Sequence, residues 1–293
     1  MKTVGCQSMV DAIKYLLVKH PQASHQTQAA MDEQWQKLFY LGPQQYKTVV
    51  QEFAGFVGLL ESFDIEIGYL PAAATTGLDS TYTHDPLVVT NKGVILCNMG
   101  KVARQAEPQA MAQYLAQVGI PLLGQIIGSG RLEGGDVCWL DERTVAVGEG
   151  YRTNAEGIRQ LRALLGDAVD EVIPVPLPHW TGPDDCLHLL SFISPVDQNL
   201  AVVYSRMMPV PFRQLLVARG IQLVEVPDEE YDSMACNVLA VAPRQCIMLS
   251  DNPITQQRLE AAGATVLTFA GKDLCLKGGG GPTCLTRPIL RIA

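Results

Sequence analysis

The chain has 293 residues, of which 47% are hydrophobic, and this is ample for the core of a globular protein. Its 22 basic and 30 acidic residues give a net charge of -8, which argues against broad binding to nucleic acid or anionic membranes, because both need a basic surface. The N-terminus lacks the apolar core of a signal peptide and no stretch reaches the roughly 18 apolar residues of a membrane span, so the sequence predicts a soluble, cytoplasmic protein.

The first apolar run, "AIKYLLVKH" at residues 12–20, predicts a strand. The next segment, residues 21–39, lacks strong patterning, and we suggest that it forms a lid over a binding site. An amphipathic helix is expected over residues 45–63, followed by a strand over residues 64–70.

From residue 85 onward the chain repeats one unit: two short strands joined by a turn, then an amphipathic helix, then another strand. The paired strands are "DPLVVTNKGVILC", "GGDVCWLDERTVAVG", "SFISPVDQNLAVVY" and "CNVLAVAPRQCIML". The helices are expected over residues 107–119, 154–166, 210–220 and 255–263. The strands that follow them are expected over residues 121–128, 171–177, 222–227 and 265–269.

The last stretch, "CLTRPILRI" at residues 284–292, has no partner strand after it. It completes a fifth unit if it pairs with the strand predicted near the N-terminus. Five ββαβ units then close into a ring, which predicts a five-bladed α/β propeller (a pentein) in one domain over residues 1–293. The alternative, a doubly wound α/β sheet, has the same elements but does not predict that the termini pair.

Eight cysteines are scattered along the chain without a C-x-x-C pair. Most are expected to be buried thiols in a reducing compartment. They lie at positions 6, 97, 138, 186, 236, 246, 275 and 284.

Polar residues recur at the start of each unit, at intervals of 47 to 52 residues. They are Asp85, Asp136, His188, Asn237 and Cys284. If every first strand starts near the axis, these side chains and the nearby Glu133 converge at one end of a central channel. A thiol near a histidine is a nucleophile with an acid/base partner, and two carboxylates beside them can bind a cation.

Four glycines, Gly278 to Gly281, and Pro282 precede Cys284. Without Cβ atoms, glycines let the backbone approach the axis or a ligand closely. A plain linker and a phosphate-binding loop are the alternatives. The run lacks the G-K-[ST] that follows in a P-loop, which argues against phosphate binding.

In order and spacing, several motifs resemble those of the guanidine-modifying superfamily, which includes arginine deiminases, dimethylarginine dimethylaminohydrolases and arginine amidinotransferases. The resemblance runs from about Tyr82 to the C-terminus and implies a five-bladed α/β propeller. The motifs are "YTHDP", "EGGD", "GYRTN", "LHL", "MACNVL" and "GGGGPTCLTRP".

The resemblance implies that Cys284 is the nucleophile that attacks the guanidinium carbon and forms a covalent thiouronium intermediate. It implies that His188 is the general acid/base, and that Glu133 and Asp85 bind the guanidinium through paired N–H bonds. Each residue also has an ordinary structural interpretation: a cysteine or histidine in an apolar run is more often part of the core, and an isolated carboxylate is often a cap.

Four further residues match family positions less closely. Arg152 resembles the anchor of the substrate α-carboxylate, although an arginine near a helix start is often merely solvated. Asp79 matches a position that contacts the amino-acid backbone of the substrate, and Arg104 is a second candidate anchor. Asp136 is expected to bind substrate or to support the "EGGD" loop.

Departures from the family pattern bear on the substrate. Deiminases and amidinotransferases have an aspartate where this chain has Leu190, and deiminases have arginine where it has His84. Without that carboxylate, an unsubstituted guanidinium would bury N–H groups without partners, at about 1 to 3 kcal/mol each. The sequence therefore favours hydrolysis of N-methylated arginine to citrulline and an amine.

Arginine deimination is the first alternative, amidinotransfer the second, and a non-catalytic propeller that binds a partner, as ribosome anti-association factors do, the third. The expected ligand is a small guanidino amino acid. No cofactor and no metal are expected, since the five histidines lie far apart and no Cys/His pair has ligand spacing. The sequence leaves open whether the chain forms a homo-oligomer.

Overall fold

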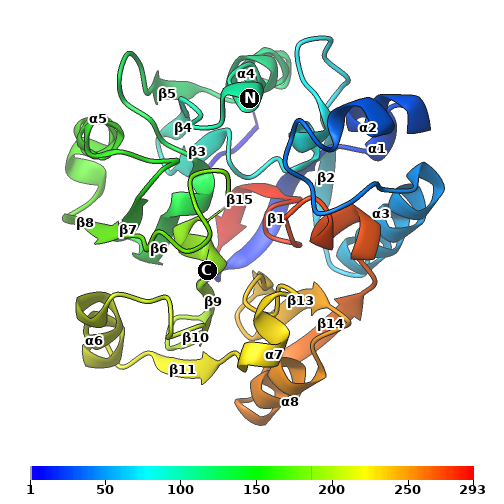
Figure 1. The fold of residues 1–293 in the computed structure, drawn as a ribbon. Helices are drawn as coiled ribbons and strands as arrows, with labels where there is room; N and C mark the ends of the chain where they lie inside the picture. Colours follow the sequence, from blue (N-terminus) through cyan, green and yellow to red (C-terminus); the bar gives the residue numbers. More distant parts are fainter. Residues whose placement is uncertain (1, 186) are drawn as a thin grey trace.

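The computed structural model describes residues 2–185 and 187–293, and it contains five three-stranded sheets. The sheets are arranged around a common axis, with helices on the periphery (Figure 1). In each sheet the first strand pairs antiparallel with the second, and the second pairs parallel with the third. The five-bladed α/β propeller predicted from the repeat is confirmed.

The blades follow the predicted units closely. The blade formed by the two ends of the chain contains β15 (Arg287–Ile292), β1 (Ala12–Val18) and β2 (Glu66–Tyr69). The next two contain β3 (Leu87–Thr90), β4 (Gly93–Leu96) and β5 (Leu122–Gln125), then β6 (Val137–Asp141), β7 (Thr144–Glu149) and β8 (Glu171–Pro176). The last two contain β9 (Ile193–Asp197), β10 (Leu200–Val203) and β11 (Gln222–Glu225), then β12 (Leu239–Ala242), β13 (Gln245–Leu249) and β14 (Thr265–Phe269).

The pairing of the two ends closes the ring. In the antiparallel register of β1 and β15, Ala12 lies opposite Ile292 and Leu17 lies opposite Arg287. Figure 1 shows this red strand beside the blue one at the centre of the molecule. Closure of the ring leaves no first strand far from the axis, so the starts of all five lie near one another.

One long helix packs outside each blade because its apolar residues recur with helical spacing. In α3 the face turned toward the sheets consists of buried apolar residues. They are Val49, Phe53, Phe56, Val57 and Leu60. The middle strands lie between a helix and the axis, so β4 and β10 are buried at every position. The long helices are α3 (Tyr46–Glu61), α4 (Glu107–Gln117), α5 (Ala155–Leu165), α6 (Val210–Ala218) and α8 (Pro253–Ala261).

Three short helices were not predicted: α1 (Pro21–Ser24), α2 (Gln28–Gln34) and α7 (Asp228–Tyr231). Caps explain the first two, because a His20 ring nitrogen accepts from Gln22 N–H and the Thr27 hydroxyl accepts from Ala30 N–H. None of the described helices is both long and apolar enough to cross a membrane.

Seven cysteines are described and all are free thiols. Six are buried, as expected, and Cys284 is partly exposed. Cys186 lies outside the described residues.

Candidate active site

A cavity of about 650 Å³ lies at the end of the propeller where the first strands begin. Four of the five residues at the repeat positions line it: Asp85, His188, Asn237 and Cys284. Asp136 lies behind the wall and is fully buried. The five positions come from five different blades, so ring closure is what brings their side chains to one place.

Cys284 lies just before β15, at the end of the glycine-rich loop. A Cβ on Gly281 would lie 2.6 Å from the Asn237 side chain, and one on Gly280 would lie 2.5 Å from the Tyr82 ring. Gly279 has a φ of +80°, which favours glycine. The loop therefore needs glycines because its backbone packs directly against the side chains around the thiol.

Asn237 holds the nucleophile candidate. Its amide Nδ2 donates to Cys284 Sγ at 3.2 Å, and its Oδ1 accepts from Thr283 N–H at 3.0 Å. The sequence placed Asn237 at a repeat position but assigned it no role. The intervals between the repeat positions were the signal that could have identified it as a functional residue.

His188 lies between two carboxylates. Its Nε2 is 2.7 Å from Glu133 Oε2, and its Nδ1 is 3.9 Å from Asp85 Oδ1. The His188 N–H donates to Ser191 Oγ at 2.9 Å, which holds the backbone at the start of a short helical turn. His188 is thus hydrogen-bonded to Glu133 through Nε2, and its Nδ1 lies beyond hydrogen-bond distance of Asp85 Oδ1.

Glu133 is fully buried and surrounded by donors. Arg152 Nη1 donates to its Oε2 at 3.0 Å, and the Lys101 backbone N–H donates to its Oε1 at 3.0 Å. Burial alone would raise the pKa of this carboxyl, but the hydrogen bond with His188 and the charge of Arg152 hold the pKa well below its usual range. Glu133 is therefore a buried anion held by the Arg152 cation and by hydrogen bonds with His188 and the Lys101 N–H.

Asp85 is the second buried anion. Arg104 Nη1 lies 2.5 Å from its Oδ2, and Gly135 N–H donates to its Oδ1 at 3.0 Å. Burial opposes ionisation, yet the charges of His188 and Arg104 lower the pKa of Asp85 below its usual value. A side chain at Gly135 would collide with the His188 ring and with Asp85, so this glycine lets the two groups come together.

Arg104 is 2% exposed, and hydrogen bonds hold its three guanidinium nitrogens. They reach both carboxylate oxygens of Glu107, Asp85 and the Tyr82 carbonyl, at 2.5 to 3.1 Å. Glu107, three residues further along, was not singled out from the sequence although an i, i+3 spacing pairs such residues on a helical turn. Burial, only partly offset by Arg104, raises the pKa of Glu107 to about 7.

Asp79 and Arg152 also line the cavity. Asp79 is ion-paired with Lys101, whose Nζ lies 2.7 Å from Asp79 Oδ2. Lys101 was missed in the sequence, where nothing distinguishes it from other surface lysines. It links Asp79 to Glu133 through its side chain and its backbone N–H.

Asp136 supports the loop that holds Glu133. Its Oδ2 accepts from the Thr153 hydroxyl at 2.6 Å, and its Oδ1 accepts from Leu189 N–H at 2.9 Å. Burial raises the pKa of Asp136 to about 6, since His188 and these two hydrogen bonds offset only part of the lost hydration. Of the two roles expected for Asp136, these contacts favour support of the loop.

We expect Asp136→Asn to stabilise the protein increasingly as pH rises. A folded pKa raised from 3.8 to about 6 means that stability is fully present below the unfolded pKa and is lost as pH rises through the folded value. At about 1.4 kcal/mol per pKa unit, the variant should gain about 3 kcal/mol over the wild type between about pH 4 and pH 7. Urea unfolding at several pH values measures the difference, with the exposed Asp32→Asn as control. A difference that does not change with pH would contradict the raised pKa.

Asp85, Glu133 and His188 each place one ligand atom within 4.8 Å of the others, a spacing that a metal ion could use. Arg104 and Arg152 already neutralise the two carboxylates. The same geometry suits a planar cation that takes the place of Arg152 beside Glu133.

Apolar side chains line both the wall and the mouth of the cavity. Leu190 lies at the wall beside His188, and Phe39, Leu41 and Trp180 are 59%, 82% and 48% exposed at the mouth. The segment suggested as a lid contributes Leu38 and Phe39 to this lining, and the Leu38 carbonyl accepts from Lys101 Nζ at 2.8 Å. That the segment opens and closes stays a prediction.

Comparison with known proteins identifies relatives over almost the whole chain. The family model for N,N dimethylarginine dimethylhydrolase, eukaryotic, matches residues 21–291. The N(G),N(G)-dimethylarginine dimethylaminohydrolase of Pseudomonas aeruginosa is 25% identical over 247 residues, which cover 84% of this chain and 91% of that protein. The arginine deiminase of Mycobacterium marinum is 30% identical over 192 residues, which cover 55% of this chain and 46% of that protein.

The fold has close structural relatives. A solved structure of a variant of the Pseudomonas aeruginosa enzyme, complexed with citrulline, superposes with a TM-score of 0.77 at 22% identity. The superposition covers 96% of this chain and all of that one. This likeness confirms the propeller fold.

Proposed function

Because the chain belongs to the N,N dimethylarginine dimethylhydrolase family, whose relatives are hydrolases acting on C–N bonds of amidines, we propose that it hydrolyses N-methylated arginine to citrulline and an amine. One observation supports this most directly. Among the described cysteines Cys284 alone is partly exposed, and it lines the same cavity as His188 and Asp85.

In the proposed mechanism the guanidinium of the substrate binds between Asp85 and Glu133 and displaces Arg152 from Glu133. Its positive charge replaces that of the arginine, so the buried carboxylate keeps a cationic partner. Arg152 then turns to the α-carboxylate of the substrate, and Asp79 meets its amino group. Arg104 has all its nitrogens engaged, so we assign it the positioning of Asp85 in place of a direct contact with substrate.

The thiolate of Cys284 attacks the guanidinium carbon, and a C–S bond forms. His188 donates a proton to the departing nitrogen, the C–N bond breaks, and the amine leaves a thiouronium intermediate. A water molecule then attacks the same carbon and gives a proton to His188. The C–S bond breaks, which releases citrulline and regenerates the thiolate.

Leu190 favours a methylated substrate over arginine. It is 6% exposed at the cavity wall, where it offers methyl groups and no acceptor. An unsubstituted guanidinium would leave N–H groups unpaired against it, at about 1 to 3 kcal/mol each, whereas N-methyl groups would pack against it. Deimination of arginine is the second candidate function, supported by the likeness to arginine deiminases.

Assays with arginine and with asymmetric dimethylarginine as separate substrates test the proposal. We expect citrulline and dimethylamine from the methylated substrate, with kcat/KM about 5- to 150-fold above that for arginine. Leu190→Asp supplies the missing acceptor and should shift the ratio toward arginine, while Leu190→Met should preserve it. Turnover of arginine alone by the wild type would favour the deiminase function and reject the first choice.

A further inference from the structure

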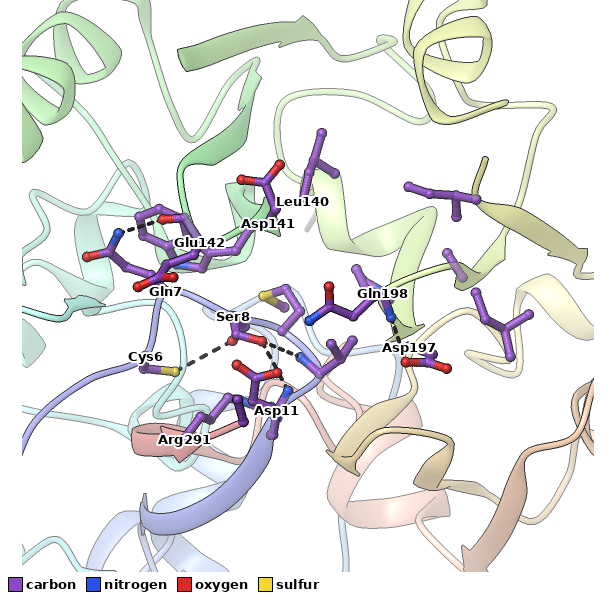
Figure 2. Close-up of a pocket in the computed structure, with 18 of the residues that line it drawn as sticks. Cys6, Gln7, Ser8, Asp11, Leu140, Asp141, Glu142, Asp197, Gln198 and Arg291 are labelled. Carbon is purple, nitrogen blue, oxygen red and sulfur yellow. Dashed lines mark hydrogen bonds between the residues drawn. The ribbon is translucent and has the colours of Figure 1, made fainter. Parts of the chain in front are cut away.

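Two more cavities lie along the axis beyond the active site. One of about 450 Å³ is at the opposite end of the propeller, where the turns of the strand pairs meet. Figure 2 shows it lined by polar side chains of the N-terminal segment and of two such turns, including Ser8, Glu142 and Gln198, with Arg291 at one side. The other, of about 20 Å³, lies between this far cavity and the active site.

The small cavity shares lining residues with each of the other two cavities, which places it between them. His84, Leu190 and Thr283 line both the active-site cavity and the small one. Cys6, Ser8, Met9, Trp139, Pro195 and Arg291 line both the small cavity and the far one. The volume of the small cavity is about what one water molecule needs.

Polar atoms without a protein partner lie along this line. Among the described residues, His84 Nε2, Arg287 Nε and Arg291 Nε are buried and have no hydrogen-bond partner. All three residues line the small cavity. Arg287 and Arg291 are four residues apart on β15, about 13 Å along the strand, so their donors follow the axis from the active-site side to the far side.

His84 offers an acceptor at the active-site end. Its Nδ1 lies 3.0 Å from the Thr286 carbonyl, which can only accept, so Nδ1 carries the hydrogen and Nε2 has a free lone pair. Burial, reinforced by the charge of Arg287, lowers the pKa of His84 to about 3, and the ring is therefore neutral. The acceptor is His84 Nε2, and the donors are Arg287 Nε and Arg291 Nε. Water can satisfy all three because it both donates and accepts, whereas an anion can only accept.

We propose that the axis of the propeller is a water path, leading from the far cavity past Arg291 and Arg287 to His84, and that it supplies the water for hydrolysis of the Cys284 intermediate. The role in hydrolysis rests on the proposed function, whereas the water sites do not. While substrate fills the cavity, its amino-acid end occupies the mouth, and the axis offers the second approach. Two buried guanidinium groups keep the cationic substrate and the protonated amine out of the path.

The water that arrives forms the new C–O bond, passes its proton to His188 and releases the sulfur. His84 is a positioning residue in this scheme, because it orients the water through Nε2 and does not itself take the proton.

A high-resolution crystal structure of the unliganded wild type tests the path without reference to any reaction. We expect ordered waters within about 3 Å of His84 Nε2, Arg287 Nε and Arg291 Nε. A dry axis, or a side chain that fills the small cavity, would overturn the proposal.

Acid-quenched mass spectrometry with His84→Phe tests the role in hydrolysis. We expect the adduct on Cys284 to form at the wild-type rate and to break down about tenfold more slowly, so that kcat and KM fall together and kcat/KM stays constant. His84→Gln, which can donate to Thr286 and accept from water, should restore breakdown. Arg291→Met, at the far end of β15, should slow breakdown while leaving labelling of Cys284 by a haloamidine unchanged.

Unchanged breakdown in both His84→Phe and Arg291→Met would overturn the role in hydrolysis, as would a fall in kcat/KM with no accumulation of adduct. If the wild type forms neither adduct nor citrulline from any guanidine, the proposed function fails together with that role, and the crystal structure alone decides whether the water path exists.

Discussion

Cys284→Ser is expected to lower kcat by at least about 10³-fold while substrate binding is retained. Serine keeps the shape of the site and can still accept from Asn237 Nδ2, but its hydroxyl is a far weaker nucleophile than a thiolate. Citrulline formation measures the loss, and calorimetric titration with the methylated substrate measures binding.

The matched control is Cys236→Ala. This second thiol also lines the cavity but is 2% exposed, and its Sγ faces the Val202 carbonyl at 3.8 Å. Its removal should leave kcat near the wild-type value. If Cys284→Ser keeps more than about a tenth of the activity, covalent catalysis by this residue is wrong.

Glu133→Gln is expected to lower kcat/KM by about 10² to 10⁴-fold. The amide keeps the size of the side chain but removes the negative charge that binds the substrate cation. Its NH₂ group must also face one of the groups now bonded to the carboxylate, which are Arg152, His188 and the Lys101 N–H. Removing one partner from a buried ion pair costs about 3 to 5 kcal/mol. If this cost raises the free energy of the transition state, it corresponds to the expected fall in kcat/KM. Steady-state kinetics and urea unfolding of the same preparations separate the catalytic loss from the loss of stability.

Glu230→Gln distinguishes a specific effect from a general loss of fold. Glu230 is another buried carboxylate, 4% exposed, and it accepts from Ile254 N–H and from the Thr255 N–H and hydroxyl at the start of α8. Its loss should reduce the free energy of unfolding without lowering kcat/KM of the folded protein. Equal kinetic losses in both variants would show that Glu133 acts through stability alone.

The sequence predicted the propeller because the signals for each blade are local. Apolar alternation, turn residues and helical spacing recur in every unit, and five copies need only ring closure to define the architecture. The pairing of β1 with β15 was predicted from the number of strands in the repeat, because one strand at each end of the chain had no partner. The residues at the starts of the first strands could be listed for the same reason.

Contacts between side chains far apart in the chain could not be predicted in this way. No spacing in the sequence indicated that Lys101 would pair with Asp79, that Arg104 would pair with Asp85, or which side chain Asn237 would contact. His84 stood out only as a departure from a family pattern, and its lone pair toward the axis depends on the Thr286 carbonyl.

By itself the sequence determined the number of blades, their order, the closure of the ring and which residues begin each first strand, because these follow from periodic burial along the chain. Only the tertiary structure decided which carboxylates remain charged, which arginines neutralise them and where the cavities lie. Those properties depend on distances of a few ångströms between groups far apart in the chain, and on the loss of water around them, neither of which any local pattern encodes.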